Sequence, residues 1–98
     1  MTQTEMFSGK NLEVATDAVS LVKTQLKLMK WEPTNNEERK KHWRDLRDTY
    51  SARLIRHAGV SPAALFIIKS VIGIFGSILP SGVFEIIKDV LRQIGIEV

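Results

Sequence analysis

The residues best suited to catalysis or metal binding in this sequence are few, and most of them lie in one short stretch. His42, Asp45 and Asp48 are spaced three residues apart, so on a helix they would share part of one face. A metal site or an acid–base pair needs further groups from elsewhere, and no other segment supplies a clear one. The sequence has no cysteine and no glycine-rich phosphate loop. We therefore interpret the trio as a solvated face with local ion pairs, assign His57 a structural role near a helix end, and expect no enzymatic activity, no metal and no cofactor.

Basic residues are concentrated between residues 37 and 56. This segment holds seven Lys and Arg residues against four acids, and the rest of the chain is balanced, so the segment carries the whole net charge of +3. Cations on one helix face can follow the phosphates of a nucleic acid, and arginine can also bridge phosphates or bind guanine. The candidate residues for binding nucleic acid or another partner are Arg39, Lys40, Lys41, Arg44, Arg47, Arg53 and Arg56.

Acids within the same segment favour a competing interpretation. Glu37 and Lys41, Lys41 and Asp45, and Arg44 and Asp48 are each four residues apart. Such pairs are typical of an exposed helix that is stabilised by its own charges. A cation that is neutralised by its own chain binds phosphate weakly, so a merely solvated face stays open as an alternative.

Two aromatic residues, Trp43 and Tyr50, accompany the basic residues on this helix. Residues 40–50, KKHWRDLRDTY, resemble the last helix of MADF domains, which belong to the Myb/SANT-like DNA-binding group. The resemblance lies in a basic pair followed by tryptophan, then leucine-arginine-aspartate, then tyrosine, and it implies DNA binding without assigning the family. The alternative is a protein partner, because aromatic and arginine residues dominate binding hot spots.

The most apolar part of the chain is residues 63–79, which would be buried on most sides as a helix. Ser70, Gly73 and Ser77 form a strip of small residues that would let another helix approach closely. Three interpretations stay open: the central helix of a monomer, a contact between identical chains, or a membrane-inserted segment. The short run and Lys69 within it argue against the membrane. The candidate self-association residues, with a dimer expected first, are Phe66, Ser70, Gly73, Ser77, Val83, Ile87, Val90 and Ile94.

Proline and glycine divide the chain into four predicted helices, over about residues 11–31, 35–57, 62–78 and 82–94. Asn11 is expected to cap the first helix. Gly59 and Gly95 are expected to end the second and the fourth. In the first helix, a three-and-four spacing predicts a buried stripe formed by Leu12, Ala15, Val19, Val22, Leu26 and Met29. Val14, Ala18, Leu21 and Leu28 widen this stripe to one side, so more than one neighbour is expected to pack on this helix. In the fourth, the residues expected to face inward are Val83, Ile86, Ile87, Val90, Leu91 and Ile94.

The 98 residues therefore predict an all-α, single-domain fold that resembles a four-helix bundle and ends in an apolar helical hairpin. Residues 1–10 are expected to form a flexible arm and residues 11–98 the domain. The N-terminus has no secretory signal pattern, so the cytoplasm or the interior of a host cell is the expected location.

The leading functional expectation is a non-catalytic binding module that self-associates through its C-terminal helices. It would bind DNA or RNA through the basic helix at residues 35–57. The first alternative is a protein-binding adaptor or inhibitor, of the kind that small viral or mobile-element proteins often are, and it would use the same helix. The second is a membrane-active helical protein that acts through residues 63–94.

Overall fold

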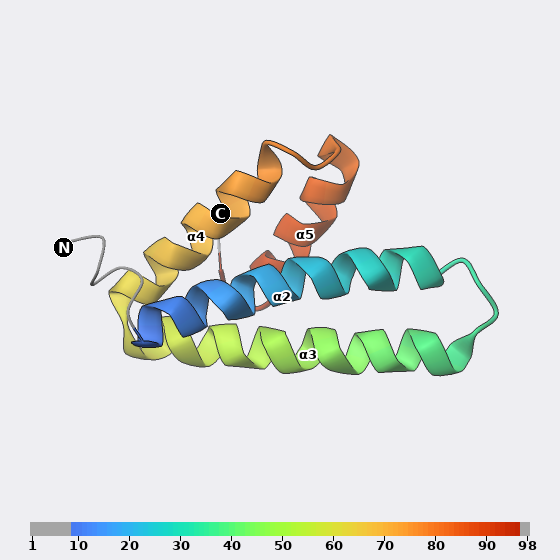
Figure 1. The fold of residues 1–98 in the computed structure, drawn as a ribbon, viewed down its shortest axis with the longest axis horizontal. Coiled ribbons are helices and arrows are strands. Elements are labelled where there is room, and N and C mark those ends of the chain that lie inside the picture. The colour runs from blue at the N-terminus through green and yellow to red at the C-terminus, as the bar shows by residue number, and fades with distance from the viewer. Residues whose placement is uncertain (1–8, 97–98) are drawn as a thin grey trace.

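A computed structural model describes residues 9–96, and over this range the chain forms four α-helices and no strand. The predicted all-α fold is therefore confirmed, and residues 1–8 of the expected arm lie outside the described residues. Labelled as in Figure 1, the helices are α2 (Gly9–Trp31), α3 (Glu37–Val60), α4 (Pro62–Gly76) and α5 (Ser81–Gln93).

Local sequence explains where the helices begin and end. Asn36 caps α3, because its side-chain oxygen accepts a hydrogen bond from the Arg39 backbone N–H at 3.1 Å. Pro62 occupies the first turn of α4, where its missing N–H costs nothing. Gly95, with φ +90°, ends the chain's last helix as predicted.

Two of the predicted boundaries are wrong. The first helix begins at Gly9, so Asn11 lies inside α2 and not at the residue before its start. Gly59 does not take a left-handed conformation, and α3 continues through it to Val60. In both places the helix runs past the expected signal residue, because packing against neighbouring helices adds to what local propensity supplies.

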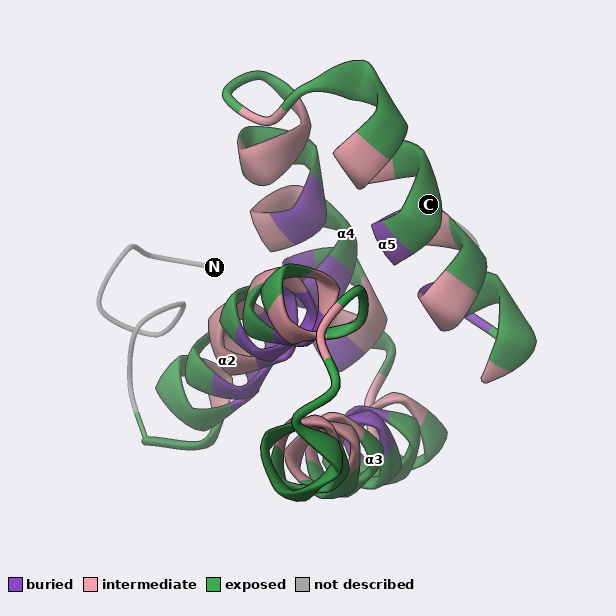
Figure 2. Ribbon diagram, turned by 90° about the vertical axis from the view of Figure 1, so that its right-hand side faces the viewer, coloured by how far each residue is buried: buried purple, intermediate pink, exposed green. Residues whose placement is uncertain are grey.

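Helix α2 makes the most extensive contacts of the four described helices, chiefly with α3 and α4. α2 and α3 form a long antiparallel hairpin, and the shorter α4–α5 hairpin leans against one end of it (Figure 1). In Figure 2 the buried residues of α2 and α4 face each other. The buried apolar residues of α2 are Val14, Ala18, Leu21, Val22 and Leu28.

The predicted three-and-four stripe of α2 is therefore less buried than the side that Val14, Ala18, Leu21 and Leu28 were predicted to add to it. Of its members Val22 is fully buried, whereas Leu12 is 51% exposed and the others are half-buried. The stripe that packs inward is shifted to the neighbouring face, where α4 covers it with Ile68 and Ile72. In α5, Ile86 was expected to face inward but is 40% exposed, whereas Ile87 lies in the core as expected.

The α4–α5 hairpin is closed by a glycine against an aromatic ring. A Cβ atom placed on Gly76 would lie 2.7 Å from Cζ of Phe84, so only glycine fits there without a shift of the ring. Ile87, Leu91 and Ile96 complete the core from the C-terminal side. No described helix is both long enough and apolar enough to cross a membrane.

Candidate functional site

Most of the basic residues predicted on α3 form ion pairs within the chain. Lys41 pairs with Asp45 as predicted. Arg44 pairs with Glu32 across the helix–helix turn, at 3.5 Å, and no ion pair joins it to Asp48. The other pairs are Lys40–Glu37 at 3.1 Å, Arg47–Asp48 at 3.4 Å and Arg53–Asp17 at 3.4 Å. Five of the seven candidate cations are thus neutralised by carboxylates of their own chain.

The remaining two candidate cations are not held in ion pairs by any described residue. Arg39 and Arg56 are exposed, and among residues 9–96 no ion pair holds them. The Arg39 guanidinium stacks 5.8 Å from the ring centre of Trp31. At Lys41, the hydrogen bond from Nζ to Asp45 Oδ2 raises the pKa of the ammonium group. α3 therefore presents less free positive charge than its composition indicates.

Free cations lie instead on α2. Lys23, Lys27 and Lys30 are all exposed, and their spacing of four and three residues places them on one face of the helix. Among the residues that the structure describes, no carboxylate comes within ion-pair distance of them. The sum of charges over the rest of the chain hid this stripe, because the acids that balance it are spread along the sequence, and those within α2, Glu13 and Asp17, lie at its other end.

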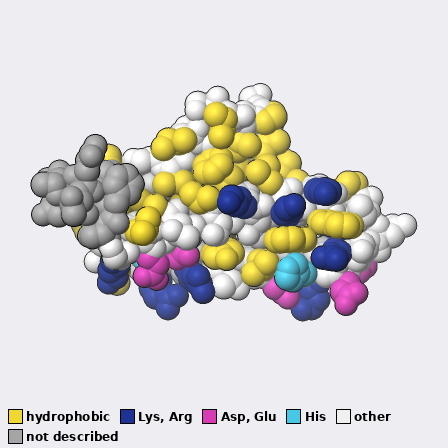
Figure 3. Space-filling view, in the orientation of Figure 1, with side chains coloured by type: hydrophobic (Ala, Val, Ile, Leu, Met, Phe, Trp, Pro, Cys, Tyr) yellow, Lys and Arg dark blue, Asp and Glu magenta, His cyan; other side chains and the backbone are white. Residues whose placement is uncertain are grey.

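A groove runs beside this stripe, between α2 and α3. It has a volume of about 280 Å³, and the residues that line it are Ser20, Lys23, Thr24, Lys27, Trp43, Leu46 and Tyr50. The floor on the α3 side is apolar, because Trp43, Leu46 and Tyr50 are half-buried and face α2. Figure 3 shows Lys and Arg side chains beside hydrophobic ones along this face of the molecule. The groove therefore combines an apolar floor with a basic edge.

A buried polar cluster fixes the opposite end of the hairpin. Asp17 is only 4% exposed, and its Oδ2 lies 2.9 Å from Nε2 of His57. Arg53 donates a longer hydrogen bond, 3.4 Å, to Oδ1 of the same carboxylate. Glu13 brings a third possible metal ligand, with all three ligand atoms within 4.8 Å of one another. Because Asp17 already binds a histidine and a guanidinium, hydrogen bonding between α2 and α3 accounts for this cluster.

His42, the histidine considered from the sequence for catalysis or metal binding, does not lie in a buried polar cluster of this kind. His42 is exposed and packs edge-on against the Trp43 ring, with the ring centres 4.8 Å apart. Asp45 and Asp48 are exposed as well, and they pair with Lys41 and Arg47. The trio therefore lies on a solvated face, and its two acids form local ion pairs.

The predicted self-association residues of α4 lie on its outer face. Phe66 is 61% exposed, Gly73 and Ser77 are exposed, and Ser70 is half-buried. A Cβ atom on Gly73 would meet nothing within 4 Å. Ile74 of the same helix, at 66%, and Ile78 just beyond its end, at 70%, are also exposed, although the sequence did not distinguish them from the core.

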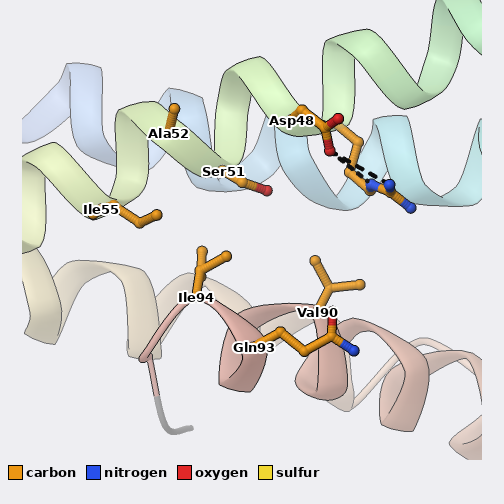
Figure 4. Close-up of a pocket in the computed structure, with 8 residues that line it drawn as sticks. Asp48, Ser51, Ala52, Ile55, Val90, Gln93 and Ile94 are labelled. Carbon is orange, nitrogen blue, oxygen red and sulfur yellow. Dashed lines mark hydrogen bonds and ion pairs between the residues drawn. The ribbon is translucent and has the colours of Figure 1, made fainter.

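The predicted residues of α5 mostly serve the chain's own core. Ile87 is 1% exposed and packs in the chain's own core, so it presents almost no surface to a second chain in this structure. Val83 and Ile94 are half-buried against the core. Val90 and Ile94 point from α5 toward α3 across an open groove of about 310 Å³ (Figure 4). The α3 side of that groove is formed by Arg47, Asp48, Ser51, Ala52 and Ile55.

Comparisons with known proteins add no relative to this description. No family model matches the chain, and no significant match was found among curated proteins or solved structures. The resemblance of residues 40–50 to the MADF helix therefore has no support from a family model.

Proposed function

We propose that this protein is a non-catalytic binding module that associates with a second copy of itself through the outer face of α4. The observation that carries the proposal is the strip Ser70, Gly73 and Ser77, which is flanked by the exposed side chains of Ile74 and Phe66. Exposed apolar groups that gather on one face of a soluble protein typically mark an interaction surface.

The chemistry of this face favours another helix as its occupant. Small residues let two helix backbones approach closely, and the larger residues beside them then pack around the contact. Burying the exposed part of a side chain such as Ile74 or Ile78 contributes on the order of 1–2 kcal/mol. A twofold contact would bury each of these residues twice, which favours a symmetric dimer.

Gly73→Leu tests the proposal without disturbing the folded chain. The added side chain meets open space in the monomer, but it would occupy the path of a second helix. We expect light scattering to give the wild-type protein a mass above 11.1 kDa and the variant the mass of one chain. Gly59→Leu is the matched control, because Gly59 is also an exposed helical glycine with open space around it and lies on α3. A wild-type protein that stays a single chain at high concentration would contradict the proposal.

Nucleic-acid binding through α3 stays a prediction, separate from the proposed self-association. Its support is the charge of the segment, and it depends on Arg39 and Arg56 together with cations that would have to leave their carboxylate partners. Because exposed ion pairs are weak, such exchange is physically accessible. Nucleic acid is therefore included in the experiment of the next subsection.

A further inference from the structure

The α2–α3 hairpin is covered by other helices along only a fraction of its length. α4 and α5 lean on the end that contains the N-terminus of α2 and the C-terminus of α3, and the end near the 32–36 turn extends beyond them (Figure 1). At this extending end, α2 and α3 must bury each other unaided. Trp43 and Leu46 consequently stay half-buried, and they form the floor of the groove with Tyr50.

The charges around this groove all have one sign. Lys23 and Lys27 line it, and Lys30 continues the same edge one turn further along α2. No acid lines the groove, and the two acids in the middle of α3, Asp45 and Asp48, pair with Lys41 and Arg47. An occupant with an apolar face and acidic side chains beside it would match both features.

We infer that this groove docks an amphipathic, acidic helix of a partner protein. A third helix laid along two antiparallel helices completes a three-helix packing arrangement, with its apolar ridge on Trp43, Leu46 and Tyr50. Its acidic residues would lie beside Lys23 and Lys27. The site is on a different face from the α4 surface proposed above, so either inference can fail without the other.

Two other occupants fit less well. A second copy of this chain offers α5 as its most amphipathic helix, but the outer face of α5 carries equal numbers of acids and bases, Glu85, Lys88, Asp89 and Arg92. A nucleic acid binds mainly through the number of phosphates that cations neutralise, and these three lysines span only about 10 Å along the helix, so they could contact few phosphates. The apolar floor would also contribute little to binding a phosphate chain.

The experiment uses a displayed peptide library to find which charge on a helical peptide favours binding to the groove. The library consists of helices of roughly 18 residues with leucine on one face and Glu, Gln or Lys at the flanking positions. We expect enrichment of glutamate at the flanks. A synthetic peptide of the enriched sequence should then change the fluorescence of Trp43 saturably in a Trp31→Phe background, where Trp43 is the single tryptophan.

Charge reversal identifies the site. Lys23→Glu combined with Lys27→Glu should weaken the peptide at least roughly tenfold, since opposite charges become like charges beside the groove. Lys69→Glu is the matched control, because Lys69 is also an exposed lysine in no ion pair of the described chain but lies on α4. It should leave the affinity unchanged.

Three results would overturn the inference. The first is enrichment of lysine, or of nothing, at the flanking positions. The second is binding that the Lys23 and Lys27 reversals do not weaken. The third is a saturable change of Trp43 fluorescence with duplex DNA or single-stranded RNA at low salt that the same reversals abolish and that displaces the peptide. This third result would assign the groove to nucleic acid.

Discussion

Asp17 is a carboxylate on the buried side of α2, next to Val14, Ala18 and Leu21 in the same stripe. Its partner His57 is 7% exposed, whereas the Arg53 side chain is 48% exposed. Asp17→Ala would leave the His57 ring buried without an acceptor, so we expect the free energy of unfolding to fall by about 2–3 kcal/mol. Urea denaturation followed by circular dichroism measures this change.

Arg53→Gln provides the contrast for that measurement. The pair it removes is half-exposed and long, so the loss should stay below about 1 kcal/mol. Equal losses for the two variants would show that His57 does not depend on Asp17. The signal for this cluster was present in the sequence, since a charged residue between apolar positions of a helix requires a buried partner. It was missed although Val14, Ala18 and Leu21 around Asp17 were predicted on the buried side of α2.

Replacing a helical glycine by leucine should change the free energy of unfolding in opposite directions in α3 and α4, because the two glycines have different neighbours. Gly76→Leu would drive the Phe84 ring out of its place, so we expect a loss of about 1–3 kcal/mol in the free energy of unfolding. Gly59→Leu adds a better helix former at an open position and should raise it by about 0.5–1 kcal/mol. Thermal unfolding of both variants checks the opposite signs, and a stabilised Gly76→Leu protein would contradict the packing described for α4 and α5.

The positions of the helices along the chain were predictable from the sequence, but the face that each helix buries was not. Pro33, Ser61-Pro62 and Pro80 divide the chain by strictly local effects on the backbone, and local effects are visible in sequence. Which face of α2 is buried depends on where α4 lies, and apolar residues occur on nearly every face of α2. The same ambiguity explains why Ile86 was expected to face inward together with Ile87, although only Ile87 is buried.

For the whole molecule, the sequence predicts how many cations each segment holds, but not which of them are free and which are held in ion pairs. Arg44 finds Glu32 and Arg53 finds Asp17 only because α2 and α3 run antiparallel, and neither pair follows from helical spacing. The lysines of α2 could likewise be recognised as unpaired only after the structure had placed the acids. Among the described residues, ion pairs therefore leave fewer free cations on α3 than its composition indicates, and three unpaired lysines lie on α2.

The open groove between α3 and α5 has a further consequence, for the order in which the molecule loses structure. α5 is anchored through α2, α4 and the buried side chain of Ile96, and no extensive contact joins it to α3. We expect the backbone amides of α5 to exchange with deuterium well before those of α2, in a cooperative opening that leaves the α2–α3 hairpin intact. Such an opening would transiently uncover Ile87 and Leu91, so the same apolar residues that hold the C-terminal helix in place would decide how readily the protein aggregates on mild heating.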